Sequence, residues 1–264
     1  MGKAIVITSG KGGVGKTTTT ANIGTGLAIL GNKVVVVDTD IGLRNLDVVM
    51  GLENRIVYDI VDVVEKTCRL KQGLIRDKRH DGLFLLPAAQ TKDKTAVKPE
   101  QMLELVNELK EEFDFVVIDS PAGIEQGFQN SIAGADEAYI VTTPEISAVR
   151  DADRVIGLLE AKGIMNPKLI INRIRQDMVK RGDMMNVDDI IDILAVDLLG
   201  VVPDDEAIVV STNRGESVGS DQSTLAVKAY NNSSRRIMGE EVELLNFNHE
   251  EGKFTKIMKI LFGK

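Results

Sequence analysis

Several features that would point to particular classes of protein are scarce in these 264 residues. The single cysteine, Cys68, cannot form a disulfide within the chain. The two histidines, His80 and His249, are too few and too far apart to indicate a metal cluster. We therefore expect neither a disulfide-bonded secreted fold nor a zinc site, and the composition favours the cytosol.

Long apolar runs and an excess of positive charge are also missing. No apolar run approaches the ~18 residues that indicate a membrane-spanning helix. The strand-like stretch AIVIT begins at position 4, which leaves no room for a signal peptide. The formal net charge is -8, so the chain has no general basic field that would attract nucleic acid. We expect a protein that is neither exported nor transmembrane and that has no specific nucleic-acid partner.

The chain does contain a regular alternation of short β-branched runs and longer helical patterns. Most of the short runs lack apolar/polar alternation, as expected of strands that are buried on both faces. Strands are predicted at 4–8, 34–37, 83–86, 115–118, 138–142, 169–172 and 198–202, and helices at 16–30, 99–112, 145–162, 184–195 and 223–238. This order predicts an α/β fold, a mostly parallel sheet flanked by helices, in a single domain over residues 1–238.

A glycine-rich loop, GKGGVGKT, lies between the first strand and the first helix and matches G-x-x-x-x-G-K-[ST] in full. In such a loop, backbone N–H groups hold phosphate oxygens, Lys16 contacts the β- and γ-phosphates, and the Thr17 hydroxyl ligates Mg²⁺. The alternative is a glycine-rich turn in which the lysine has no role in binding. The residues predicted to bind nucleotide here are Gly10, Lys11, Gly12, Gly13, Val14, Gly15, Lys16, Thr17 and Thr18.

Lys11 is an extra lysine that the general loop pattern does not require. In a loop wrapped around phosphates, its side chain would point away from the phosphates that its own backbone holds. Two interpretations stay open: a solvated surface lysine, or a lysine that reaches the phosphate of a second molecule across a dimer interface.

Three carboxylates follow strands that lead toward the same site. Asp38 and Asp40 end the second predicted strand, and Asp119 ends the strand at 115–118. Ligands of open α/β sheets bind at this carboxyl edge, where such groups hold Mg²⁺ and orient an attacking water. Any one of them could instead be an ordinary turn residue, but all three together indicate a phosphate-hydrolysing site.

The loop KGGVGKT resembles that of the deviant P-loop ATPases, the group that includes the MinD, ParA and nitrogenase iron protein families. Longer stretches, IGLRNLDVVMGLENRIVYDIVDVV, DSPAGIE, TTPEISAVRDADR and RGDM, closely resemble the MinD family of septum-site-determining ATPases from residue 3 to about 238. The resemblance implies an ATP-sandwich homodimer in which Lys11 contacts the partner's nucleotide. It also implies that ATP and Mg²⁺ are the cofactors.

The same resemblance implies roles for individual residues. Asp40 would orient the water and act with Lys11 and Lys16 in catalysis, while Thr17, Asp38 and Asp119 would hold the metal. Adenine would be held by Asn172 and by Pro203 with Asp204, although either segment could be ordinary loop structure.

The resemblance also implies a MinC-like inhibitor of division as a partner. The regulator could be a MinE-like activator or a static polar organiser, and the sequence leaves both open. Arg44, Asp151 and Asp153 are the partner-binding candidates. Charges at the start of the helix at 145–162 could equally form a solvated helix start.

The last 26 residues differ in character from the rest of the chain. Residues 239–252 are acidic and polar, as in a tether, and residues 253–264 read KFTKIMKILFGK. One helical face of this segment would carry Phe254, Ile257, Met258, Leu261 and Phe262. Together with four lysines, this pattern predicts an amphipathic helix that binds anionic membrane lipid. The alternative is a C-terminal helix packed on the body.

A single tail would bind a membrane only marginally. Burial of five apolar side chains contributes ~1.5–3 kcal/mol each, and each lysine near anionic lipid adds ~1 kcal/mol. Ordering the segment opposes this by about 1–2 kcal/mol per residue. Two tails on one dimer would gain ~10²–10⁴ in avidity, so dimerisation would control attachment.

The sequence therefore favours an ATPase switch that dimerises with ATP and recruits a division inhibitor. We expect it in the bacterial cytoplasm and, as a peripheral protein, at the inner face of the cell membrane. A flagellar-number regulator of the same family is an alternative. Another is a ParA-like DNA segregation ATPase, for which Arg235 and Arg236 offer weak support. A reductase with a shared iron–sulfur cluster is excluded because Cys68 stands alone.

Overall fold

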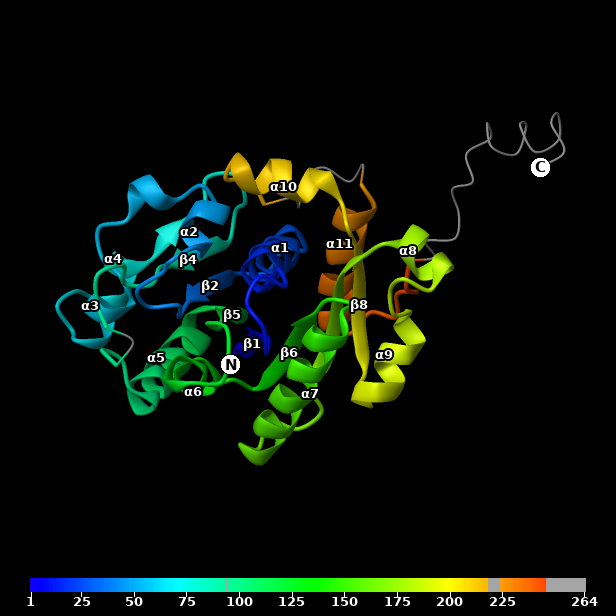
Figure 1. Ribbon diagram of the computed structural model, residues 1–264. Helices are drawn as coiled ribbons and strands as arrows, with labels where there is room; N and C mark the ends of the chain where they lie inside the picture. The colour runs from blue at the N-terminus through cyan, green and yellow to red at the C-terminus, as the bar shows by residue number, and fades with distance from the viewer. Residues whose placement is uncertain (94, 218–223, 246–264) are drawn as a thin grey trace, which may run out of the picture.

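The computed structural model of the chain describes residues 1–93, 95–217 and 224–245. An eight-stranded sheet forms the centre, in the order β3-β4-β2-β5-β1-β6-β7-β8 (Figure 1). The strands are β1 Lys3–Thr8, β2 Val34–Asp38, β3 Ile75–Arg76, β4 Leu83–Leu86, β5 Phe115–Asp119, β6 Glu137–Thr142, β7 Lys168–Ile174 and β8 Leu198–Pro203.

Seven of these strands run parallel, and only the short β3 pairs antiparallel, with β4. The parallel strands are continuous Val, Ile and Leu runs because helices cover both of their faces. The all-valine run of β2, for instance, is fully buried. The predicted mostly parallel α/β sheet is confirmed.

Helices pack on both faces of the sheet. They are α1 Lys16–Ile29, α2 Leu46–Val49, α3 Ile60–Val64, α4 Leu70–Gly73, α5 Pro99–Glu112, α6 Gln126–Ile132, α7 Ile146–Ala161, α8 Gln176–Arg181, α9 Val187–Leu194, α10 Glu206–Asn213 and α11 Leu225–Ile237, with a 3₁₀ turn at Glu53–Arg55. One face packs against α1, α2, α10 and α11, and the other against α3 to α9.

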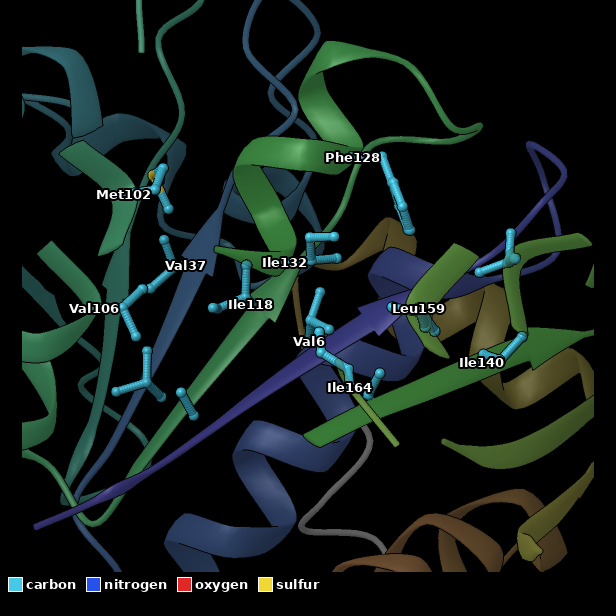
Figure 2. Close-up of a cluster of buried hydrophobic side chains, with 14 of the residues drawn as sticks. Val6, Val37, Met102, Val106, Ile118, Phe128, Ile132, Ile140, Leu159 and Ile164 are labelled. Atoms are coloured by element: carbon cyan, nitrogen blue, oxygen red, sulfur yellow. The ribbon is translucent and has the colours of Figure 1, made fainter. Parts of the chain in front are cut away.

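The two faces follow from the alternation of side chains along each strand. Val6 of β1 points into the cluster drawn in Figure 2, where it lies with Phe128 and Ile132 of α6 and Leu159 of α7. Its neighbours on β1 point the other way, toward α1 and α11. Apolar side chains therefore fill most of both layers, although α1 and α11 also bury polar side chains such as Thr19, Thr25 and Ser234.

The sheet order fixes the position of the candidate site. β5 lies between β1 and β2, so the loops that follow these three strands meet at one point of the carboxyl edge. The glycine-rich loop follows β1, and the predicted acidic residues follow β2 and β5.

The predicted elements agree with the structure, with specific omissions. All seven predicted strands and the five predicted helices are present, with ends shifted by up to three residues. The antiparallel strand β3 and the helices α2, α3, α4, α6, α8 and α10 were not predicted.

The first part of the predicted tether is attached to the body. Arg235 pairs with Glu240 at 2.7 Å, and Arg236 donates to the carbonyls of Leu199, Val242 and Glu243. The membrane-binding residues predicted in the segment 253–264 lie outside the described residues. Within the described ranges, no helix has the length and apolar character needed to cross a bilayer.

Candidate nucleotide site

The glycine-rich loop joins the end of β1 to the start of α1. Gly15 caps α1 with φ of 92°, a left-handed conformation that favours glycine. A Cβ atom at this position would also lie 2.2 Å from Nδ2 of Asn172. Lys16, only 9% exposed, begins the helix, and the first turn holds no acidic residue. The positive end of the helix dipole therefore faces the loop unopposed, as anion binding requires.

Asn172 supports the loop from β7. Its Nδ2 donates to the carbonyl of Val14 at 2.8 Å, and its Oδ1 accepts from the N–H of Arg173 at 3.0 Å. The predicted adenine residues Asn172, Pro203 and Asp204 all border one hollow together with Gly15 and Thr18 of the loop. The hollow measures about 40 Å³ and is also lined by Ile208 and Val209 of α10.

Asp119 and Asp38 lie side by side at the ends of β5 and β2, where they are register partners. Each is 1% exposed. Asp119 accepts from the Thr20 hydroxyl at 3.0 Å and from the Thr17 hydroxyl. Asp38 accepts from three backbone N–H groups, those of Asp40 at 2.9 Å and of Asn45 and Leu46 at 3.2 and 3.1 Å.

Burial shapes the electrostatics of this carboxyl pair. Burial first, and repulsion from Asp119 second, raise the pKa of Asp38 to about 7 against the opposing backbone hydrogen bonds. Burial likewise raises the pKa of Asp119, although Lys16 and the two threonine hydroxyls oppose the shift. The positive charge of Lys16 therefore does not offset the burial and mutual repulsion of the two carboxylates.

The donor set fits a magnesium ion. Two carboxylates that repel each other and a threonine hydroxyl are hard oxygen ligands, the kind that Mg²⁺ takes. No cluster of three or more His, Cys, Asp or Glu side chains that could hold a metal occurs in the part of the chain that the structure describes. Mg²⁺ needs no such cluster, because it is bound through one or two carboxylates together with substrate phosphates.

Asp40 lies in the loop between β2 and α2 and is half-buried. Its backbone N–H donates to Asp38, and its charge contributes to the raised pKa of both Asp38 and Asp119. The structure therefore places the predicted water-orienting residue at the predicted metal site. The loop from Asp40 to Leu46 closes on Asp38 through three N–H groups.

Lys11 turns toward α7. Its Nζ donates to Oε2 of Glu145 at 3.1 Å and to the hydroxyl of Ser147 at 3.0 Å, and its side chain is 41% exposed. Sequence reasoning missed both partners. They lie in the stretch TTPEIS at the end of β6, which is the one signal that could have drawn attention to them, because that strand also ends at the carboxyl edge.

The three candidates for partner binding lie on two different elements. Asp151 and Asp153 lie on α7, and the carbonyl of Asp151 packs so closely on Gly10 that a Cβ there would lie 2.3 Å from it. Asp153 is exposed. Arg44, in the loop after β2, pairs through Nε with Oδ2 of the buried Asp47 at 2.9 Å. Arg44 is thus paired within the chain, and Asp151 lies next to the phosphate loop through its backbone.

A large cleft adjoins this site without covering the phosphate loop. It measures about 880 Å³ and lies between the start of α7, the end of β7 and the segment containing α8 and α9. Its lining includes both partners of Lys11 as well as Arg173, Met184 and Asp204.

Comparison with known proteins identifies the family. Residues 5–218 match the CobQ/CobB/MinD/ParA nucleotide binding domain. The chain is 59% identical over its whole length to the septum site-determining protein MinD of Bacillus subtilis, of which it covers 99%. In a MinC:MinD cell division protein complex of Aquifex aeolicus, a chain 50% identical superposes with a TM-score of 0.87, covering 93% of this chain and all of that one. The MinD of Pyrococcus horikoshii complexed with Mg-ADP, 29% identical, superposes with a TM-score of 0.81 over 90% of this chain and 96% of that one. The chain therefore belongs to the MinD septum site-determining family of nucleotide-binding proteins.

Proposed function

We propose that this protein is a Mg²⁺-dependent ATPase that dimerises with ATP, binds the inner face of the bacterial membrane and recruits a MinC-like inhibitor to control placement of the division septum. The observation that carries the proposal is the convergence of a complete phosphate loop with buried Asp38 and Asp119 on one side and the additional Lys11 on the other. The similar Pyrococcus protein complexed with Mg-ADP supports the choice of cofactors.

The chain's own residues divide the work of hydrolysis. Backbone N–H groups of residues 10–18 and the Lys16 ammonium bind the β- and γ-phosphates. Thr17, Asp38 and Asp119 would hold Mg²⁺, which would supply positive charge against the phosphate oxygens. Asp40 accepts a hydrogen bond from the attacking water and orients it toward the γ-phosphate.

ATP controls assembly through Lys11. Its pairing with Glu145 is exposed, and such pairs contribute only ~0–1 kcal/mol because water screens them. The triphosphate of a second subunit carries more charge than one carboxylate, so it can draw Lys11 away from α7. After hydrolysis, the γ-phosphate is gone and the interface weakens.

Dimerisation in turn controls membrane attachment and the recruitment of partners. Two tails with the sequence of residues 253–264 act together on one dimer, which makes binding depend on ATP. The complex of MinC with the similar Aquifex chain supports a MinC-like partner. Asp151, Asp153 and Arg44 are the proposed contacts. A MinE-like activator would stimulate turnover.

Sedimentation with liposomes of anionic lipid tests the proposal. Full-length protein should sediment with ATP or a nonhydrolysable analogue and stay in the supernatant with ADP, and a chain ending at Glu251 should never sediment. Lys11→Ala should bind nucleotide yet stay soluble, while Lys228→Ala, which changes an exposed lysine of α11, should behave like the wild type. Sedimentation of Lys11→Ala at the wild-type level would contradict the dimer mechanism.

The two alternatives give different outcomes in matched assays. A DNA segregation ATPase would cosediment with DNA in the presence of ATP, but Arg235 and Arg236 are engaged within the chain by Glu240 and by backbone carbonyls. A flagellar regulator would be retained by flagellar components rather than by MinC in a pull-down.

A further inference from the structure

Two segments that flank the candidate nucleotide site meet next to α1. The first is the end of α2, which begins directly after the loop closed on Asp38. The second is the turn after α10, a helix that begins next to Pro203 and Asp204. In Figure 1, α10 passes above α1 toward α2, and the two helices are in contact.

The two backbones approach each other closely through a pair of glycines. Gly51 and Gly215 both have φ of 63°. A Cβ on Gly51 would lie 2.4 Å from the carbonyl oxygen of Gly215, and a Cβ on Gly215 would lie 2.5 Å from Cα of Gly51. Only glycine fits at either position, so each segment limits where the other can lie.

Arg79, from the turn between β3 and β4, joins these two segments. Its Nη1 donates to the carbonyl of Gly215 at 2.6 Å, and its Nη2 donates to the carbonyl of Met50. A guanidinium can hold two carbonyls at once because its N–H groups form a rigid fork. The same segment is also tied to α1, since the Thr25 hydroxyl donates to the Ser217 hydroxyl at 2.8 Å.

Asp77 fixes the turn that presents Arg79. It is 2% exposed and accepts from the backbone N–H of Arg79 at 2.6 Å and of His80 at 3.0 Å. Burial by itself would raise the pKa of Asp77, but hydrogen bonds from His80 and Arg79 hold it well below its usual range. The carboxylate is therefore charged at neutral pH, and it lies 3.4 Å from Nη2 of Arg79.

We infer that Arg79 is a positioning residue that couples the base end of the nucleotide site to the loop carrying Asp40. The inference rests on the proposed ATPase function. When a base enters the hollow beside Asp204, α10 shifts, and Arg79 passes this shift to Met50 and so to α2 and the loop closed on Asp38. Arg79 belongs neither to the phosphate loop nor to the lining of the hollow beside Asp204, so it acts through this coupling rather than by direct contact with the nucleotide.

Arg79→Ala tests this coupling by separating kcat from affinity. We expect kcat for ATP to fall by about 2- to 30-fold, the range that mutations of coupling residues outside both sites can reach, while the dissociation constant for pyrophosphate, which has no base, stays within twofold. Arg76→Ala is the matched control, because Arg76 lies on the same hairpin and its exposed side chain pairs with the exposed Asp81. An unchanged kcat in Arg79→Ala, or a kcat loss of the same size in Arg76→Ala, would overturn the inference.

Hydrogen exchange gives a second readout that does not depend on turnover. In the wild type, ADP should protect residues 46–51 more than pyrophosphate, which fills the phosphate loop but has no base. In Arg79→Lys, which keeps the charge but lacks the rigid planar fork of the guanidinium, this difference should vanish. Equal protection by both ligands in the wild type, or a difference retained in Arg79→Lys, would disprove the coupling. A wild type that hydrolyses no ATP would instead disprove the proposed function.

Discussion

The two sides of the phosphate loop are built in opposite ways. On one side, Asp38 and Asp119 are almost fully buried and each is held by at least two hydrogen bonds. On the other, Lys11 is 41% exposed and is held by one carboxylate and one hydroxyl. The buried side is preformed for chemistry, whereas the exposed side can exchange its partner at little cost. The proposed switch would need both, since catalysis requires fixed groups and assembly requires a contact that can be released.

The largest effect should follow a change on the buried side. Asp119→Asn keeps the size of the side chain but removes a charge that the proposed Mg²⁺ site needs. We expect kcat for ATP to fall by ~10²–10³, as when one preorganised polar group of an active site is lost. The free chain should become no less stable, because repulsion with Asp38 disappears. A steady-state assay and a thermal melt check both halves, and a loss of activity accompanied by a large loss of stability would contradict this account.

The buried side should also make stability depend on pH. Burial and Asp119 raise the pKa of Asp38 to about 7 in the folded chain from 3.8. A folded pKa above the unfolded one means that protonation favours the native state. This contribution is complete below pH ~4 and is lost as pH rises through about 7.

Thermal melts without nucleotide or metal test this dependence. Between pH 8 and 6, the melting temperature of the wild type should rise relative to that of Asp38→Asn, which has no carboxyl to titrate at that position. Saturating Mg²⁺ with ADP should reverse the trend, since bound cation favours the charged carboxylate. Parallel curves for wild type and Asp38→Asn would show that Asp38 does not titrate in this range.

The contrast also explains which features the sequence reveals. The strands and the loop at Gly10–Thr17 are encoded by neighbouring residues, so both could be predicted. The contacts of Lys11 with Glu145, of Asn172 with Val14 and of Arg79 with Gly215 join residues more than 130 positions apart. No local pattern encodes such a pair.

The missed elements have physical reasons of their own. β3 has two residues, too few to show a period. α10 and α8 contain no fully buried residue, so neither displays a clear apolar stripe. The attachment of residues 240–245 to the body could not be predicted, because Arg236 donates to backbone carbonyls, which every residue type has.

An intermediate effect is expected at Thr20, which links α1 to the buried side. Thr20→Val keeps the shape of the side chain but leaves Asp119 without one of its donors. Loss of a buried hydrogen bond of this kind costs about 1–3 kcal/mol. Urea denaturation should show this loss in the free energy of unfolding. Thr18→Val, at a half-buried position on the same helix turn, is the control and should change stability less.

The smallest effect should be found on the exposed side, and its smallness is informative. Lys11→Ala removes a pair with Glu145 that water screens, so the free energy of unfolding should change by less than ~1 kcal/mol. Glu145→Gln should likewise leave stability almost unchanged, and it should lower the protein concentration at which ATP produces dimers, because Lys11 then has a weaker competitor. Denaturation and analytical ultracentrifugation measure the two quantities separately. If Lys11→Ala lowered the free energy of unfolding by several kcal/mol, Lys11 would be a fixed structural group. The failure of this variant to dimerise would then result from impaired folding. If Glu145→Gln raised the protein concentration needed for dimers, Glu145 would stabilise the dimer interface directly instead of competing with it for Lys11.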